Sequence, residues 1–253
     1  MGRRLGQHFL KSGAVERLLR VVDPAASETF LEIGAGGGAL TRPLASRAGR
    51  VVAVEIDSRL AAHLRAAALP NVNVVEGDAL TLELAPLAPD GARVVGNLPY
   101  YVSSPILRKV LELRGRVRDV HVMVQEEVAE RIASPPGSKA YGVLSVLFGL
   151  FADLDIPLRF ARNCFVPRPG VDSALLRVRF LPAPRAPIPD PQAFEQLVHR
   201  AFSRRRKTLE NNLQDSYPNL KDHLRLLNIA GTRRAETLSV VEFAALSRAL
   251  VLD

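Results

Sequence analysis

Phe30-Leu31-Glu32-Ile33-Gly34-Ala35-Gly36-Gly37-Gly38 is the stretch that decides the fold of this chain. Its first four residues are typical of a buried strand, and a glycine-rich turn follows them directly. A helix-like stretch then runs from Ala39 to Ala48. Glycines at such a turn let the backbone approach a ligand beside the free amides of a helix N-terminus, although a plain tight turn has the same pattern. The stretch therefore predicts a strand–turn–helix unit of an α/β protein.

Acidic residues follow the next two predicted strands. The apolar run Val51–Val54 ends in Glu55, which lies roughly 20 residues past the first glycine, where a ribose would offer paired hydroxyls. The run Val72–Val75 leads to Asp78, whose carboxylate can accept a hydrogen bond from an adenine amino group. Either residue alone could be a helix cap. Their joint position at strand ends predicts a nucleoside cofactor.

A fourth strand end carries the tetrapeptide Asn97-Leu98-Pro99-Tyr100, which follows Arg93–Gly96. An asparagine oxygen and a nearby carbonyl accept hydrogen bonds from an exocyclic amine, and an aromatic ring stacks on the base that bears it. Asn-x-Pro is also an ordinary turn sequence. At the carboxyl end of a strand, where α/β enzymes carry their chemistry, it predicts a site for a planar base with an amino group.

Two cofactors compete for this site. Gly34-x-Gly36-x-x-Ala39 also fits the dinucleotide fingerprint of dehydrogenases. A nicotinamide dehydrogenase explains the glycines but gives Asn97–Tyr100 no role. The four strand ends together resemble the adenine-N6 methyltransferases that use S-adenosyl-L-methionine and release S-adenosyl-L-homocysteine.

Composition and charge narrow the range of partners that this protein could bind. The chain has 253 residues, a formal charge of +8 and 47% apolar residues, with a pI near 10.2, which favours a globular protein with a polyanionic partner such as nucleic acid. The longest apolar stretch, Tyr141–Ala152, is shorter than the ~20 residues of a membrane span, and the N-terminus lacks an apolar signal region. We expect a cytoplasmic protein, with a monomer as the default state. Cys164 is the single cysteine and the five histidines show no ligand spacing, so no metal is implied.

Strand-like and amphipathic stretches alternate up to about Phe180, as a doubly wound parallel sheet requires. The pattern predicts helices over 58–69, with Ser58 as N-cap, and over 105–113. It predicts further strands at Val120–Val124 and Ala174–Phe180.

The segment Leu181–Pro191 has a proline at every second or third position, which no helix or interior strand accommodates. We therefore expect a boundary there, with an α/β domain at 1–181 and an all-helical C-terminal domain at 182–253. The predicted helices of the second domain are Phe194–Phe202, Leu220–Ile229 and Val240–Val251.

Motifs along nearly the whole chain resemble those of the bacterial small-subunit (16S) ribosomal RNA adenine N6,N6-dimethyltransferases. They are Gly6-Gln7-His8-Phe9-Leu10, Glu32 to Gly38, Glu55-Ile56-Asp57, Gly77-Asp78-Ala79, Asn97 to Tyr100, Phe165-x-Pro167-x-Pro169-x-Val171-Asp172-Ser173-Ala174, and Ala201-Phe202-x-x-Arg205-Arg206-Lys207-Thr208-Leu209. The resemblance implies a Rossmann-like S-adenosylmethionine-dependent methyltransferase sheet whose last strand is antiparallel, followed by a small helical domain.

The resemblance also implies which residues bind the cofactor. Gln7, His8 and Leu10 are expected to form a lid, and Gly34 and Gly36 a turn beneath the methionine portion. Glu55 is expected to contact the ribose, and Ile56 to pack on the adenine. Asp78 and Ala79 are expected to recognise the adenine edge. Asn97 would then lie between cofactor and substrate.

A second set of residues is expected to handle the target base. The side-chain oxygen of Asn97 and the carbonyl of Leu98 accept from the amine, Pro99 fixes the turn, and Tyr100 stacks on the flipped base. Phe165 is the candidate for the opposite face, with a core aromatic as the alternative.

The basic run Arg204, Arg205, Arg206 and Lys207 suits phosphate contacts, although such runs are often only solvated.

The resemblance implies dimethylation of two adjacent adenosines near the 3′ end of 16S rRNA, within the small ribosomal subunit during ribosome biogenesis. One alternative is the sister enzyme that methylates large-subunit rRNA and confers macrolide resistance. The stretches Val171–Ala174 and Ala201–Leu209 favour the small-subunit enzyme. Another alternative is a non-catalytic ribosome-assembly factor, against which the intact Glu55, Asp78 and Asn97 argue.

Overall fold

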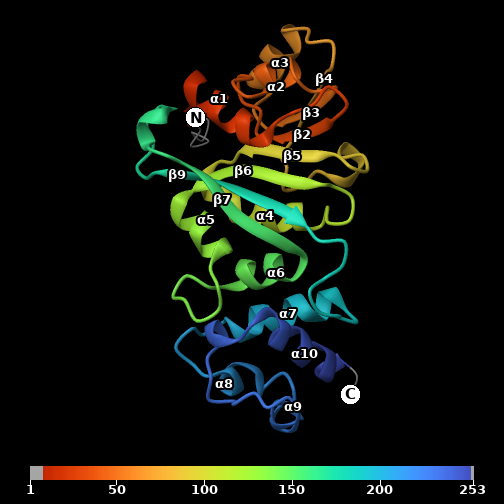
Figure 1. Cartoon of the computed structure of the whole chain (residues 1–253), viewed down its shortest axis with the longest axis vertical. Coiled ribbons are helices and arrows are strands. Elements are labelled where there is room, and N and C mark those ends of the chain that lie inside the picture. Colours follow the sequence, from red (N-terminus) through yellow and green to blue (C-terminus); the bar gives the residue numbers. More distant parts are fainter. Residues whose placement is uncertain (1–7, 252–253) are drawn as a thin grey trace. The chain divides into compact units, whose positions relative to one another are not determined.

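The computed structural model describes residues 8–251, which divide into two compact units (Figure 1). The first contains the residues up to Ala129 and Leu154–Phe180, and the second contains Glu130–Asp153 and the residues from Leu181 onward. The second unit thus includes Glu130–Asp153, which the proline-rich boundary in the sequence leaves with the first.

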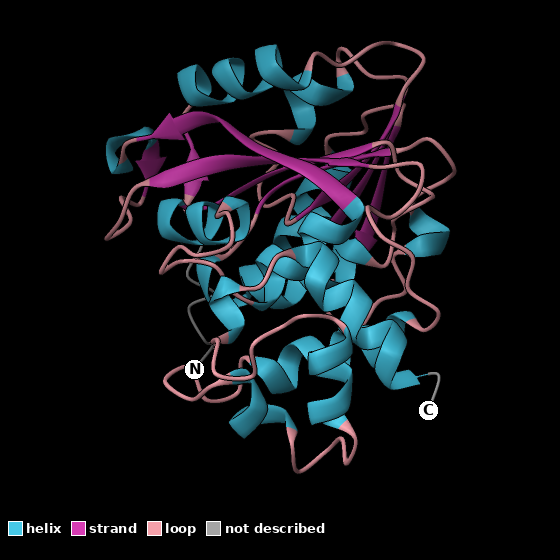
Figure 2. Cartoon of the chain, turned by 60° about the horizontal axis from the view of Figure 1, so that its bottom comes forward, coloured by secondary structure: helices cyan, strands magenta, loops and turns pink. Residues whose placement is uncertain are grey.

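A seven-stranded sheet forms the centre of the first unit (Figures 1 and 2). Its strands are β2 (Thr29–Ile33), β3 (Arg50–Glu55), β4 (Val72–Glu76), β5 (Arg93–Asn97), β6 (Asp119–Gln125), β7 (Ala152–Phe160) and β9 (Ser173–Phe180), in the order β4-β3-β2-β5-β6-β9-β7. The pairs among β4, β3, β2, β5 and β6 are parallel, whereas β9 is antiparallel to β6. The predicted Rossmann-like sheet with an antiparallel last strand is confirmed. The strand order changes direction between β2 and β5, where such sheets open a ligand crevice at their carboxyl ends.

The central strands are apolar because helices and loops cover both of their faces. In β2, Phe30, Leu31 and Ile33 are at most 1% exposed, and Val51 and Val52 of β3 are at most 2% exposed. Parallel strands of this kind have continuous apolar runs rather than alternating ones. This explains why the sequence pattern reveals them.

The helices of the first unit differ in detail from the sequence expectation. They are α1 (Ser12–Val22), α2 (Thr41–Ala45), α3 (Ser58–Ala66), α4 (Ser103–Leu111) and α5 (Glu126–Ala133), the last of which extends into the second unit. Helix α2 is shorter than the predicted 39–48. The N-cap of α3 is Asp57 and not Ser58, because the Asp57 carboxylate accepts from the backbone amides of Arg59 and Leu60.

A buried ion cluster joins the amino ends of three strands, at the edge opposite the glycine turn. Arg93, which is 3% exposed, donates to Asp119 at 2.8 Å and to Glu28 at 2.9 Å. Arg118 also donates to Glu28. Burial opposes ionisation of Asp119, but the adjacent His121, whose Nδ1 lies 3.5 Å from the carboxylate, and the hydrogen bond from Arg93 lower the pKa of Asp119 to about 2. The cluster thus ties together the starts of β2, β5 and β6.

A second, two-stranded sheet joins the start of the chain to a distant segment. Strand β1 (Phe9–Leu10) pairs antiparallel with β8 (Phe165–Val166), with Phe9 opposite Val166 and Leu10 opposite Phe165. The amide of Lys11 continues the pairing by donating to the carbonyl of Cys164.

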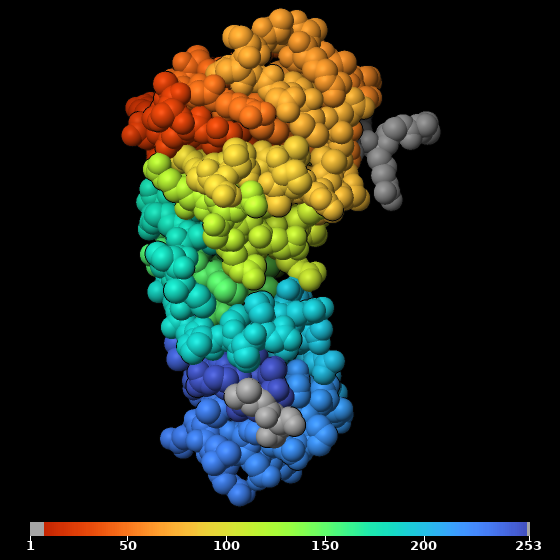
Figure 3. All heavy atoms as spheres, turned by 90° about the vertical axis from the view of Figure 1, so that its right-hand side faces the viewer, coloured from red at the N-terminus to blue at the C-terminus, as the bar shows by residue number. Residues whose placement is uncertain are grey.

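The second unit consists mainly of helices. These are α6 (Val143–Phe151), α7 (Pro191–Ala201), α8 (Leu209–Leu213), α9 (Leu220–Leu226) and α10 (Val240–Val251). Asp190 caps α7 by accepting from the amides of Gln192 and Ala193, next to a proline at the first helical position. Phe202 stacks on Phe243 with ring centroids 5.9 Å apart. On the face that Figure 3 shows, the residues of the C-terminal part of the chain (blue) gather together.

Candidate functional site

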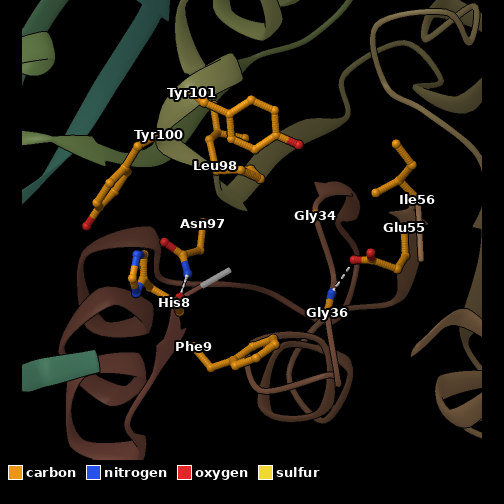
Figure 4. Close-up of a pocket in the computed structure, with 11 residues that line it drawn as sticks. His8, Phe9, Gly34, Gly36, Glu55, Ile56, Asn97, Leu98, Tyr100 and Tyr101 are labelled. Atoms are coloured by element: carbon orange, nitrogen blue, oxygen red, sulfur yellow. Dashed lines mark hydrogen bonds between the residues drawn. The ribbon is translucent and has the colours of Figure 1, made fainter. Parts of the chain in front are cut away.

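Two adjoining cavities lie at the carboxyl ends of β2 to β5 in the first unit. His8, Asn97 and Tyr100 line one side of the first cavity, and Gly36, Glu55 and Ile56 line the other (Figure 4). The second cavity, of about 560 Å³, is lined by residues that include Ile56, Asp78, Ala79, Tyr101, Val102 and Ile106. Gly34, Ile56, Pro99 and Tyr101 border both cavities. The second volume is in the range of small-molecule sites.

The glycine turn requires glycine at two positions that border the first cavity. Gly34 and Gly36 have φ of +78° and +57°, which other residues adopt only with strain. A Cβ atom on Gly36 would lie 2.8 Å from the ring of Phe9, and one on Gly34 would lie 3.5 Å from the carbonyl oxygen of Asn97. The turn therefore lets β1 and the Asn97 loop approach it closely.

The Glu55 carboxylate is held in place by backbone amides. Its two oxygens accept from Gly36 at 2.6 Å and from Asp57 at 2.9 Å (Figure 4). The residue is 2% exposed and borders the first cavity. Because each carboxylate oxygen has two lone pairs, both can still accept from a ligand hydroxyl.

Asp78 and Ala79 lie together in the second cavity, with Ile56 as an exposed apolar neighbour. Asp78 is fixed by the amide of Leu80, which donates to its carboxylate at 2.9 Å. Ile56 is 45% exposed, which is unusual for an isoleucine at a strand end. An apolar platform beside an acceptor fits a planar base that bears an amino group.

The Asn97 amide has a defined orientation. Its nitrogen donates to the carbonyl oxygen of His8 at 2.6 Å (Figure 4). This contact uses the donor end of the amide, so the other end presented to the cavity is the acceptor oxygen. The loop itself is anchored by the amide of Leu98, which donates to the carbonyl of Met123 at 3.1 Å.

Tyr100 is fixed at its hydroxyl and beside its ring. The hydroxyl forms a 2.6 Å hydrogen bond with the Ser173 hydroxyl, and the His8 ring lies 5.5 Å from the Tyr100 ring at 31°. Burial raises the pKa of Tyr100 and the charge of Asp172 adds to the rise, against the opposing effect of the Ser173 hydrogen bond. The ring is therefore a neutral stacking surface.

Glu32 is a buried carboxylate under the glycine turn. It is 1% exposed, and among residues 8–251 its Oε2 has no hydrogen-bond partner. Burial and the nearby charge of Glu55 raise the pKa of Glu32 to about 8, although Thr41 acts to lower it. The sequence analysis gave this residue no role beyond its strand.

Two predicted site residues of the described chain, Phe165 and Leu10, line neither of the two cavities. Phe165 is 2% exposed, belongs to the hydrophobic core and lines neither cavity, which agrees with the core alternative instead of a ring over the target base. Leu10, its partner in the two-stranded sheet, is also in the core. Gln7 lies outside the described residues.

Sequence reasoning missed Tyr101, Val102 and Ile106, which line the second cavity. Tyr101 is 62% exposed, and an aromatic residue directly after the Asn97 tetrapeptide was an available signal. Val102 and Ile106 reach the cavity because a 3₁₀ turn, η2 (Tyr100–Val102), leads into α4. That turn is not visible as a sequence pattern.

The basic run lies in the second unit, between α7 and α8, and its members differ. Arg204 donates to the Asn212 side chain and to the carbonyl of Asn211, and Arg205 donates to the carbonyl of Lys139. The side chains of Arg206 and Lys207 are exposed and have no partner within residues 8–251. Two of the four cations are thus structural tethers.

No group of three or more His, Cys, Asp or Glu residues in the described part of the chain could hold a metal ion. None of the described helices is long and apolar enough to cross a membrane.

The strand order, the glycine turn and the polar strand ends define a Rossmann-like methyltransferase. Residues 2–250 match the family model for ribosomal RNA adenine dimethylase. The chain belongs to this family, so it is a methyltransferase and the dehydrogenase alternative is excluded.

Named relatives agree with this membership. A protein of Leptothrix cholodnii named ribosomal RNA small subunit methyltransferase A is 42% identical over 98% of this chain and 91% of its own length. A Bacillus cereus protein with the same name is also 42% identical, over 99% of this chain and 91% of its own length. The crystal structure of a dimethyladenosine transferase from Plasmodium falciparum has a TM-score of 0.79 and 26% identity, covering 94% of this chain and 96% of the other. The crystal structure of the 23S rRNA methyltransferase ErmE has a TM-score of 0.70 and 27% identity, covering 96% of this chain and 99% of the other.

Proposed function

We propose that this protein dimethylates the N6 amino groups of two adjacent adenosines near the 3′ end of 16S rRNA, in the small ribosomal subunit, with S-adenosyl-L-methionine as methyl donor. The observation that carries the proposal is the orientation of Asn97, whose acceptor oxygen faces the first cavity because His8 occupies its nitrogen. An acceptor at that point suits an amine and not a carbonyl.

The choice of small-subunit RNA is supported by the relatives. Two proteins that are 42% identical to this chain carry the small-subunit name, whereas the 23S rRNA enzyme ErmE is 27% identical. The macrolide-resistance type of enzyme is therefore the weaker candidate.

The cavities offer matching groups for the cofactor. The Glu55 carboxylate accepts from the ribose hydroxyls, Ile56 packs on the adenine, and Asp78 with Ala79 recognises the adenine edge. Gly34 and Gly36 lie beneath the methionine portion. His8 borders the same region, and Gln7 and Leu10 are the further residues that we assign to a lid over the cofactor. When bound, S-adenosylmethionine supplies a sulfonium methyl group, and S-adenosylhomocysteine is the product.

The protein's main contribution is alignment of the target amine. The lone pair of an adenine amino group is delocalised into the ring, so the amine is a poor nucleophile until its nitrogen becomes pyramidal. The side-chain oxygen of Asn97 and the carbonyl of Leu98 favour that geometry by accepting the N–H groups, and Tyr100 stacks on the flipped base. In-line transfer then forms the N–C bond as the C–S bond breaks, and the amine proton leaves to solvent.

RNA contacts outside the cavities fall to the basic run of the second unit. Arg206 and Lys207 have free side chains that suit phosphates, and Arg204 and Arg205 hold the surrounding backbone. In this scheme residues 1–181 catalyse and residues 182–253 contact RNA. The protein acts as a cytoplasmic monomer.

Methyl transfer to small ribosomal subunits that lack the modification tests this function. Radiolabelled S-adenosylmethionine is offered with these subunits or with large-subunit RNA, and the labelled nucleoside is identified by mass spectrometry. We expect N6,N6-dimethyladenosine in the small subunit alone. Label in large-subunit RNA alone would show that the protein is of the macrolide-resistance type. RNA binding without any label would indicate a non-catalytic assembly factor.

A further inference from the structure

The strongest unexplained contact at the site is the hydrogen bond between Tyr100 and Ser173, 2.6 Å long. Ser173 is the first residue of β9 and pairs with Gln125 of β6, so the sheet fixes its backbone. Its exposed fraction is 0%, so its hydroxyl is shielded from solvent. The sequence alone favours only a turn-stabilising role for Ser173.

A second contact holds the same ring from another segment. The His8 ring lies 5.5 Å from the Tyr100 ring, and His8 Nδ1 is 2.7 Å from the carbonyl oxygen of Pro167. Tyr100 is thus braced at its hydroxyl by β9 and beside its ring by the N-terminal segment. The partly exposed Tyr100 ring is therefore held by two segments that are far apart in the sequence.

We infer that Ser173 is a positioning residue that holds the Tyr100 ring in its base-stacking orientation, and that the second of the two methyl transfers depends on it most. This inference rests on the proposed function, in which Tyr100 stacks on the target adenine.

The two rounds differ in how firmly the base is held. An unmodified adenine offers two N–H groups to the acceptors of Asn97 and Leu98, whereas the monomethylated base offers one. Each round forms one N–CH₃ bond, breaks one S–CH₃ bond and releases one amine proton. With fewer hydrogen bonds in the second round, stacking on Tyr100 has a larger share in alignment, so a loosened ring slows that round more.

The test uses the whole protein with small ribosomal subunits that lack the modification. Ser173→Ala, Tyr100→Phe and the double variant are compared with the wild type, and mass spectrometry follows mono- and dimethyladenosine over time. We expect Ser173→Ala to slow the second round about tenfold relative to the first, so that monomethyladenosine accumulates. Affinity for S-adenosylmethionine stays within about twofold of the wild type. The double variant resembles either single variant, because both remove the same bond.

Ser145→Ala is the matched control for loss of a buried serine hydroxyl. Ser145 is 3% exposed, donates to the carbonyl of Arg131 and accepts from the amide of Gly142, all within the second unit. We expect it to lower the melting temperature without changing the product ratio.

Two outcomes would overturn the inference. One is an unchanged ratio of mono- to dimethyladenosine in Ser173→Ala at equal total methylation, and the other is additive effects in the double variant. If Ser173→Ala does not fold, Tyr100→Phe still removes the bond from its other end and decides the matter. A wild-type protein that transfers no methyl group would contradict the proposed function itself, which is a different result.

Discussion

At the scale of single residues, the site is defined by which end of each polar group is already occupied. The nitrogen of Asn97 is bound to His8, and each Glu55 oxygen has one backbone donor. Such contacts fix both side chains before a ligand arrives, and fixed groups lose little freedom on binding. Single substitutions should therefore separate binding from catalysis.

Asn97→Ala removes the acceptor for the target amine but leaves the cofactor cavity intact. We expect kcat for methyl transfer to fall by about 10²–10³, as for loss of one preorganised hydrogen-bonding group, while S-adenosylmethionine still binds. Activity assays and calorimetry measure the two effects. Asn71→Ala is the control, since Asn71 donates to the carbonyls of Ala45 and Ala48 away from the cavities. Full activity in Asn97→Ala would contradict the proposed mechanism.

Glu55→Gln weakens the contact with the ribose hydroxyls. Since an ionised acceptor forms stronger hydrogen bonds than a neutral one, we expect the Kd for S-adenosylmethionine to rise about tenfold or more. Isothermal titration measures it. The matched change is Glu76→Gln on the neighbouring strand, where Glu76 is the register partner of Glu55 but pairs with Arg65. Equal effects of the two substitutions would remove Glu55 from the cofactor site.

At the scale of structural elements, the glycine turn and the amino ends of the strands have separate roles. The turn between β2 and α2 brings Phe9 and the Asn97 loop together at the carboxyl edge. The ion cluster around Arg93 joins β2, β5 and β6 at the amino edge. Changes in the turn should impair binding, and changes in the cluster should affect stability.

Gly36→Ala tests the turn. Its φ of +57° and the 2.8 Å approach to Phe9 make any Cβ costly, so we expect the protein to lose ~1–2 kcal/mol of stability and part of its cofactor affinity. Chemical denaturation and titration measure both. Gly37→Ala is the control, because within residues 8–251 no heavy atom beyond its chain neighbours lies within 4 Å of its Cβ position, and its φ is not positive. Similar losses in both variants would mean that the close contact with Phe9 is unimportant.

Asp119→Asn tests the ion cluster through pH. Because the folded pKa of Asp119 is about 2, below its ordinary value near 4, its contribution is present above pH 4 and is lost as pH falls towards 2. We expect the variant to lose about 3 kcal/mol of unfolding free energy at pH 7, and the difference from the wild type to shrink between about pH 4 and pH 2. Asp90→Asn, whose exposed carboxylate pairs with Arg116, should change little. If the difference in unfolding free energy between the variant and the wild type did not change with pH, ionisation of Asp119 would not be the source of its stabilising effect.

The sequence predicts those parts of the site that local patterns encode. The strand ends at Glu55, Asp78 and Asn97 are found because each apolar run and its polar residue are neighbours in the chain. Strand β7 is missed because it contains Pro157, which an outer strand tolerates. The bond from Tyr100 to Ser173 and the burial of Phe165 depend on long-range pairing, which no local pattern carries.

At the scale of the whole molecule, positive charge is the property that suits an RNA partner. The formal charge of +8 attracts a polyanion without selecting a sequence, so selection falls to the cavities of the first unit. RNA is read largely through its shape, which fits a division between a charged contact surface and a base-handling site.

Arg206→Gln tests the contact surface. Removing one phosphate contact should weaken RNA binding and reduce the slope of log K against log salt by about 0.7–1. Filter binding across a salt series measures it. Arg206 is preferable to Arg204, whose loss would also release Asn211 and Asn212. Arg225→Gln removes an exposed arginine of the same unit that pairs with Asp222, and it should leave the slope unchanged. An unchanged slope for Arg206→Gln would exclude it from the interface.

The pairing of β1 with β8 limits when the site can form during synthesis of the chain. His8 and Pro167 are in contact although they are 159 residues apart. Strand β1 therefore has no pairing partner until β8 has been translated. A nascent chain stalled before residue 165 would have the glycine turn, Glu55 and Asn97, but neither β8, which pairs with β1, nor Ser173, which holds the Tyr100 hydroxyl. The catalytic site is thus completed late in translation.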